Sequence, residues 1–258
     1  MKKTIRFLKV VALLATVGLV ALFVLRWKLD DFGDPLLNAA YSGNVKKVAQ
    51  LLEAGEDPNK CDSYCNTPLT LAAHTDQAEI AAMLIAHGAN LSIADDSGMT
   101  PLHCAAYKGN VAVATVLLDH GSAVNTTDRW YGSSPLSEAV RTGSCAMVNL
   151  LIDHGADVKH RDRLGWQPIH GVLRSSGLSG EERLAIAAIL LEHGADPNAP
   201  NGREEPDSHV GYRPPGNPNQ GDSPLAIAQS NGFIDIVELL KKYGAKEDKV
   251  MSDAEPPR

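Results

Sequence analysis

Two cysteines, Cys61 and Cys65, stand four residues apart in KCDSYCNTPL, directly before a Thr-Pro-Leu. Thiols at this spacing can form a redox couple, half of a metal site or a disulfide, or can be two independent thiols. A zinc site needs more ligands than this stretch supplies, and a thioredoxin-type pair uses Cys-x-x-Cys at the start of a helix. The choice among the alternatives depends on the surrounding elements and on the compartment.

The nine histidines do not group like metal ligands or catalytic bases. Six recur at two fixed places: His87, His120, His154 and His193 before a glycine, and His103 and His170 after Pro-Leu or Pro-Ile. Cys104 and Cys145 lie in apolar helical patterns and are expected to be small core residues. Because phosphate-loop, His-Glu-x-x-His and Gly-x-Ser-x-Gly motifs are also missing, we expect no enzyme, no cofactor, no metal and no small-molecule substrate.

The N-terminal segment has the pattern of a membrane anchor. Sixteen uncharged residues, from Val10 to Leu25, are flanked by basic residues. This run makes roughly 24 Å of helix, and snorkelling flanks extend it across a core of about 30 Å. We therefore expect a transmembrane helix through residues 7–27, within a signal anchor of residues 1–28, followed by a linker at 29–33. A cleaved signal peptide with a secreted product is the alternative.

The charges around this segment predict its orientation. Four basic residues precede the run, whereas Asp30, Asp31 and Asp34 soon follow it. The positive-inside rule then predicts that the N-terminus stays in the cytoplasm and that the chain after Lys28 lies on the other side of the membrane. A short chain with few Asn-x-Ser/Thr sites, at Asn90 and Asn125, favours a bacterial source. We expect a single-pass inner-membrane protein with its main domain in the periplasm.

The remaining chain is acidic. Of 24 Lys and Arg residues, six lie within residues 1–28, which hold no acid, so the other 230 residues carry 18 basic and 31 acidic side chains, a net charge of −13. Such a domain repels phosphate backbones, so nucleic acid is excluded as a partner, and a neutral or basic protein partner is expected.

A short motif repeats along this acidic part. Six segments of the type TPLHCAA contain an aligned proline: Pro35, Pro68, Pro101, Pro135, Pro168 and Pro224. The successive gaps are 33, 33, 34, 33 and 56 residues. Thr or Ser before the proline supplies a helix N-cap, and a glycine about 20 residues later can end a second helix in the left-handed conformation. Units of this size gain stability by stacking on their neighbours.

The segment GANLSIADDSGMTPLHCAAYKGN, residues 88–110, resembles the ankyrin-repeat consensus GADVNxxDxxGxTPLHxAAxxGH. The resemblance covers about residues 34–247 and implies an all-α repeat solenoid of six stacked ankyrin repeats with β-hairpin fingers. The repeats are expected near 34–66, 67–99, 100–133, 134–166, 167–222 and 223–247. Extra residues fall within 174–183 and in a long finger insertion at 201–220, and residues 248–258 are expected to be disordered.

The resemblance also implies that a protein partner binds at the fingertips and at the ends of the first helices. Matching finger positions are Ser63, Tyr64, Asp96, Met99, Trp130, Tyr131, Arg163, Leu164 and Trp166, with Tyr212 in the insertion. Matching helix positions are His74, Tyr107, Lys108, Arg141 and Thr142. Three aromatic residues on neighbouring fingers place the expected centre on repeats three to five.

The repeat register assigns the two cysteines. Cys61 takes the place of Ala94 and Cys65 that of Gly98, so the thiols flank a fingertip and can face each other. An oxidising compartment then favours a Cys61–Cys65 disulfide, with unpaired thiols as the alternative.

Together these features predict a membrane-tethered ankyrin solenoid that serves as a protein–protein interaction scaffold outside the cytoplasm. One alternative is a periplasmic immunity or protective factor for a toxin or a stress enzyme. Another is a structural spacer in the cell envelope.

Overall fold

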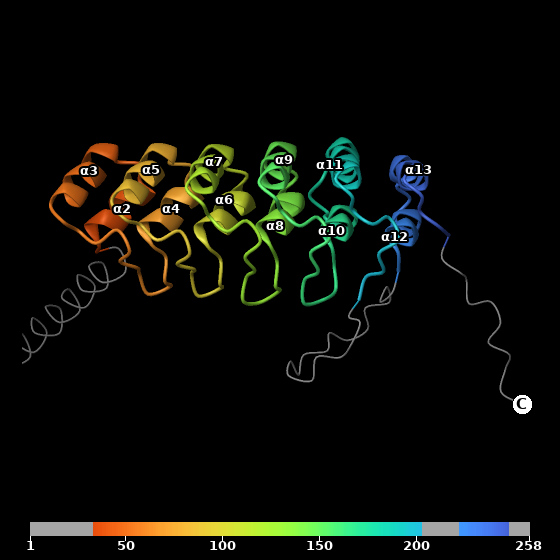
Figure 1. Cartoon of the computed structure of the whole chain (residues 1–258), viewed down its shortest axis with the longest axis horizontal. Helices are drawn as coiled ribbons and strands as arrows, with labels where there is room; N and C mark the ends of the chain where they lie inside the picture. Colours follow the sequence, from red (N-terminus) through yellow and green to blue (C-terminus); the bar gives the residue numbers. More distant parts are fainter. Residues whose placement is uncertain (1–32, 203–221, 248–258) are drawn as a thin grey trace, which may run out of the picture.

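The computed structural model describes residues 33–202 and 222–247, and these parts contain helices and loops without strands. Figure 1 shows the helices in two parallel rows, with long loops extending beyond one of them. The row nearer the loops consists of α2 (Pro35–Tyr41), α4 (Pro68–His74), α6 (Pro101–Lys108), α8 (Pro135–Thr142), α10 (Pro168–Arg174) and α12 (Pro224–Ser230). We call these the first helices.

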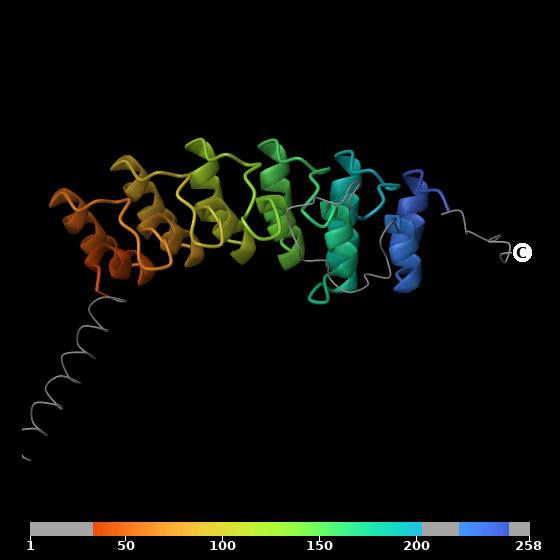
Figure 2. The same cartoon turned by 90° about the horizontal axis from the view of Figure 1, so that it is seen from below.

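The other row contains the second helix of each pair: α3 (Val45–Glu53), α5 (Ala78–Ala86), α7 (Val111–Asp119), α9 (Cys145–Asp153), α11 (Gly180–Glu192) and α13 (Ile234–Lys242). Each first helix packs on its own second helix and on the first helices before and after it. Figure 2 shows the pairs following one another along a gently curved, elongated molecule. Because contacts run only between neighbouring pairs, the architecture is a solenoid.

The helix starts follow the expected proline rule. Each of the six aligned prolines is the first residue of a first helix, where its missing N–H is no loss. In α4 the Thr67 hydroxyl accepts the Thr70 amide at 3.2 Å, and in α2 the Asp34 carboxylate accepts the Leu36 amide at 2.8 Å. The N-caps predicted from Thr or Ser before proline are confirmed at Thr67, Ser134 and Ser223, and Asp34 caps α2 in the same way.

The second helices end at glycines in the left-handed conformation, as expected. The φ angles lie between +85° and +89° at Gly55, Gly88, Gly121, Gly155, Gly194 and Gly244. A side chain would strain the backbone there, which explains why glycine recurs at this place.

A continuous apolar core lies between the two rows. Leu69, Leu102, Leu136 and Ile169 occupy equivalent places in successive first helices and are fully buried. Each contributes roughly 2 kcal/mol by leaving water. Since these side chains pack across the boundaries between pairs, a single pair would leave much of its apolar surface exposed.

The expected β-hairpin fingers are present as loops rather than hairpins in the described residues. In the second finger the Asp95 amide donates to the Met99 carbonyl at 3.0 Å, which begins a ladder. The Met99 amide, however, donates to the Asp95 carboxylate at 2.9 Å instead of completing the pair. The carboxylate therefore replaces the second ladder bond, and the prediction of strands was wrong.

The extra residues between the helices of the fifth pair lengthen α11 to 13 residues, compared with nine in each of the other second helices. Arg183 of α11 is buried and donates to the carbonyls of Val172 and Ser175 at 3.1 and 2.6 Å. Its guanidinium also lies over the Phe233 ring, 4.3 Å from the centroid. A charged residue thus joins the fifth pair to the sixth, which the sequence pattern did not indicate.

Several expectations fall outside the described residues: the anchor through 7–27 with its linker, most of the insertion at 201–220 including Tyr212, and the tail at 248–258. Among the helices of residues 33–202 and 222–247, none combines the length and the apolar character that crossing a membrane requires.

Candidate protein-binding surface

A recurring aspartate shapes the tips of the first four fingers. In the third finger Asp128 is buried and accepts the amides of Trp130, Tyr131 and Ser133 at 2.7, 2.8 and 2.7 Å. Asp62, Asp95 and Asp162 make the same kind of turn in the other fingers. Because the carboxylate holds successive amides, the side chains at the tip have fixed directions.

Adjacent fingertips are hydrogen-bonded into a row. Amides of one finger donate to carbonyls of the finger before it: Asp96 to Tyr64 at 3.1 Å, Arg129 to Ser97 at 2.8 Å, and Arg163 to Tyr131 at 2.7 Å. The approach is so close at Gly98 that a Cβ there would lie 2.5 Å from the Arg129 nitrogen. Four tips therefore form one rigid row, which we call the fingertip row.

Large apolar side chains protrude from this row. The exposed fractions are 64% for Tyr64, 65% for Trp130, 63% for Tyr131 and 36% for Leu164. Trp130 and Tyr131 are consecutive, and Leu164 follows the residue that bonds to Tyr131. Exposed aromatic residues on a fixed backbone are favourable anchors for a partner because they bury a large area at low entropy cost.

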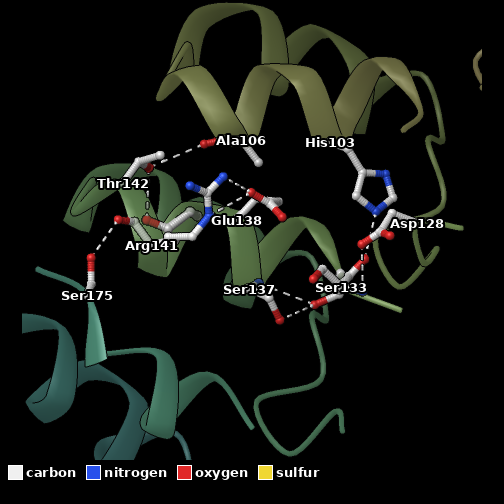
Figure 3. A network of polar contacts seen from close by, with 11 residues as sticks. His103, Ala106, Asp128, Ser133, Ser137, Glu138, Arg141, Thr142 and Ser175 are labelled. Atoms are coloured by element: carbon white, nitrogen blue, oxygen red, sulfur yellow. Dashed lines mark hydrogen bonds and ion pairs between the residues drawn. The ribbon is translucent and has the colours of Figure 1, made fainter. Parts of the chain in front are cut away.

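The C-terminal ends of the first helices form a second row, which we call the helix-end row. Tyr41, His74, Tyr107, Arg141 and Arg174 occupy its equivalent positions, each seven residues after an N-cap. Neighbouring ends are joined: the Thr142 hydroxyl contacts the Ala106 carbonyl at 3.5 Å, and the Ser175 hydroxyl donates to the Arg141 carbonyl at 3.1 Å (Figure 3).

Arg141 of the helix-end row is in contact with two other side chains. Its guanidinium donates twice to one oxygen of Glu138, at 2.6 and 3.2 Å (Figure 3), and lies over the Tyr107 ring. The Lys108 ammonium lies over the same ring, 5.3 Å from its centroid. Burial lowers the pKa of His74, and the positive charge of Lys108 lowers it further. His74 therefore adds little positive charge at neutral pH.

Trp166 does not lie at a fingertip. It directly precedes Gln167, the N-cap residue of α10, and its amide donates to Asp162 at 2.9 Å. The indole is half-buried, with the Arg174 guanidinium 3.9 Å from a ring centroid. This stack links the helix-end row to the fourth finger, so the two rows form one continuous surface.

The other residues expected on the surface divide by exposure. Ser63, Asp96, Lys108, Arg163 and Thr142 are exposed, whereas Met99 is half-buried and packs against the core. The sequence pattern missed Arg129, Arg174 and Tyr41, which are also exposed. Two of these, Tyr41 and Arg174, occupy the position of Tyr107 in their own units, so the repeat register was a sufficient signal for them.

Cys61 and Cys65 are free thiols in the structure, on either side of the first fingertip. The Asp96 carboxylate, which hydrogen-bonds the Cys65 thiol, and the adjacent Cys61 thiol raise the pKa of Cys65. Cys65 adopts a φ of +60°, whereas the matching Gly98 has +81°. The two thiols are thus neighbours, and the disulfide between them stays a prediction.

The histidines after the first-helix prolines are used by the fold. Nδ1 of His170 accepts the Gln167 amide at 3.1 Å, while Nε2 donates to the Ala199 carbonyl at 2.9 Å. In α6, Nδ1 of His103 likewise accepts the Thr100 amide, and Nε2 donates to the Ser133 carbonyl at 3.1 Å (Figure 3). Across residues 33–202 and 222–247, no cluster of three or more His, Cys, Asp or Glu side chains is arranged to bind a metal.

Comparisons with known proteins decide the family. The family model for ankyrin repeats in three copies matches residues 36–128 and again 123–201. The chain belongs to the ankyrin repeat family. Ankyrin repeats are generally protein–protein interaction modules and are typically non-enzymatic.

A solved structure is similar over most of this ankyrin-repeat chain. The crystal structure of an ankyrin repeat domain from Acinetobacter baumannii AYE has a TM-score of 0.70 and 27% sequence identity, over 82% of this chain and 98% of that chain. A search of curated proteins gives no match. The sixth helix pair, α12 and α13, lies beyond the residues that the family model covers.

Proposed function

We propose that this chain is a membrane-tethered interaction scaffold that binds a protein partner outside the cytoplasm, and that it catalyses no reaction. The fingertip and helix-end rows of units three to five are the binding surface. The observation that carries the proposal is the exposure of Trp130 and Tyr131 on a finger whose backbone is held by Asp128. A solvent-exposed Trp-Tyr pair costs solubility, and burial against a partner offsets that cost.

The tether and the compartment are supported by the sequence. The uncharged run from Val10 to Leu25 with basic flanks is typical of a signal anchor, and the acids that follow it favour export of the solenoid. In a bacterium the compartment would be the periplasm. Reporter fusions after residue 40 test this part: a reporter active only outside the cytoplasm should be active, and activity of a cytoplasm-only reporter would overturn it.

The binding surface is tested by comparing two variants of the full chain. Trp130→Ala with Tyr131→Ala should reduce the yield of crosslinked partner about tenfold or more, because central aromatic anchors carry much of the binding energy. Ile234→Ala is the matched control, since Ile234 is 71% exposed but begins α13 in the other row. If both variants retain the same partners as the unmodified chain, the fingertip row is not the interface.

A further inference from the structure

The charges of units three to five are segregated between the two faces of the solenoid. Between residues 100 and 202, five of the six exposed Lys and Arg side chains lie on the fingertip and helix-end rows: Lys108, Arg129, Arg141, Arg163 and Arg174. The sixth, Lys159, lies in the fourth finger before its tip. The exposed acids at the C-terminal ends of the second helices lie in the other row: Asp119, Asp153 and Glu192. Glu181 and Glu182, in the first turn of α11, adjoin the helix-end row instead, because Glu182 lies beside Gly143. Arg183, the basic residue among these second helices, is buried.

The acids on the binding side are largely turned inward. Asp128 is buried under three backbone amides, and Asp162 is half-buried under those of Leu164 and Trp166. Glu138 is bonded to Arg141. Both oxygens of Asp128, and one oxygen each of Asp162 and Glu138, accept hydrogen bonds from this chain, whereas the guanidinium groups of Arg129, Arg163 and Arg174 are on exposed residues. A partner approaching these rows therefore meets mainly cations, with Asp96, Glu181 and Glu182 as exposed acids at their edge.

The net charge of the domain does not cancel this local charge. The second helices lie one layer behind the first, and packed helix axes are about 8–10 Å apart. At an ionic strength of about 0.1 M, charges are screened over roughly 10 Å. The acids at the C-terminal ends of the second helices are therefore partly screened from the finger side, and the nearer cations have the larger effect on what binds there.

We propose that the partner presents an acidic segment, rich in Asp and Glu with apolar residues among them, to these rows. This inference rests on the proposed function and specifies its ligand. Guanidinium groups bind carboxylates by paired hydrogen bonds, and Arg141 is already oriented by Glu138 and Tyr107. Trp130, Tyr131 and Leu164 would take the apolar side chains. For this face, an acidic partner segment replaces the neutral or basic partner that the net charge led us to expect.

An acidic protein segment fits this surface better than a nucleic acid does. A phosphate backbone is long and continuous, and it would extend past the five cations toward a domain with a net charge of −13 beyond residue 28. A short segment can contact the cations and end there. Duplex DNA is included below as a competing polyanion.

Selection of random peptides displayed on phage against the full chain in mild detergent tests the inference. Selected peptides should be enriched in Asp and Glu. A labelled selected peptide should bind about tenfold more tightly than its isostere with Asn and Gln in place of the acids, and this advantage should shrink as salt rises from about 0.05 to 0.5 M. Duplex DNA should not displace it.

A matched pair of charge reversals gives the control. Lys108→Glu with Arg129→Glu and Arg163→Glu should abolish the preference for acids. Lys46→Glu with Lys47→Glu and Lys242→Glu changes the net charge equally, but these lysines are exposed on α3 and α13 of the other row, so the preference should remain. Equal loss in both variants would show that net charge, not this face, is responsible, and would overturn the inference.

The outcomes separate this inference from the proposed function. Peptides that depend on Trp130 and Tyr131 but show no enrichment in acids would refute the acidic ligand and leave the scaffold standing. Peptides whose binding ignores both aromatic residues would refute the fingertip interface itself. Displacement by duplex DNA at equal charge would assign the cations to a nucleic acid and overturn the inference.

Discussion

The guanidinium carbon of Arg141 lies 4.7 Å from the centroid of the Tyr107 ring. Tyr107 in α6 and Arg141 in α8 occupy equivalent positions of successive first helices. The contact therefore spans two repeating units. Since Glu138 holds the other side of the guanidinium, Arg141 is fixed between its own helix and the preceding one. The helix-end row is thus ordered before any partner binds, which lowers the entropy cost of binding.

This contact should be measurable as a coupling energy. In a double-mutant cycle with Tyr107→Leu and Arg141→Met, we expect the pair to contribute about 0.5–1 kcal/mol to the free energy of unfolding, as exposed cation–π contacts do. Urea denaturation of the four proteins gives the value. Tyr107→Phe, which keeps the ring, should retain most of the coupling; a coupling near zero would mean that the two side chains are independent.

Asp76 should be a site of stored backbone strain. Its φ is +58°, at the place where other first helices are followed by Gly43, Gly109, Gly143 and Gly232, all with positive φ. Asp76→Gly should raise the free energy of unfolding by about 1 kcal/mol, because glycine adopts this conformation without steric cost.

The reverse substitution is the control for that prediction. At Gly109 a Cβ would have its nearest contact at 3.6 Å, so space is not limiting. Gly109→Asp should therefore lower the free energy of unfolding by about 1 kcal/mol, through backbone strain alone. Thermal denaturation of both variants decides the matter, and a destabilised Asp76→Gly would show that the aspartate side chain matters more than its conformation.

The Cys61–Cys65 bridge can be tested by counting thiols. In protein isolated without reductant from the exported compartment, labelling after unfolding should find two free thiols if the bridge forms, those of Cys104 and Cys145. After reduction it should find four. Four free thiols before reduction would exclude the bridge. Without unfolding, Cys104 should stay unlabelled, because burial raises the pKa of its thiol to about 12.

Much of the fold was predictable from the sequence because its signals are local. The prolines that begin the first helices and the glycines that end the second follow from backbone geometry alone, and a fixed spacing then dictates stacking. The prediction of strands in the fingers was wrong because the Asp95 carboxylate accepts the Met99 amide, which a strand ladder would use for a backbone hydrogen bond. Such competition between a carboxylate and the backbone cannot be read from periodicity.

The candidate surface was predictable in position but less so in detail. Fingertip exposure of Trp130 and Tyr131 followed from the register, since the tip of a finger has few neighbours. The stacking of Trp166 on Arg174 could not be predicted, because the two residues are eight apart and lie at opposite ends of α10. The segregation of charge also required the structure, because it depends on which row each helix occupies and on the burial of Arg183.

The neutral state of His170 should make the solenoid less stable in mild acid. Burial lowers the pKa of His170 to about 4. Nδ1 of His170 accepts a hydrogen bond from the Gln167 amide, and a proton on Nδ1 would point at that amide and break the bond. The unfolded chain takes up this proton near its ordinary pKa of about 6.5, so stability is full above that pH and falls until about pH 4. The loss from this group should reach about 3 kcal/mol at most. Urea denaturation at pH 7 and near pH 4.5 should show a smaller loss for His170→Gln than for the unmodified chain. Equal losses would mean that His170 is not the group whose neutrality the fold requires.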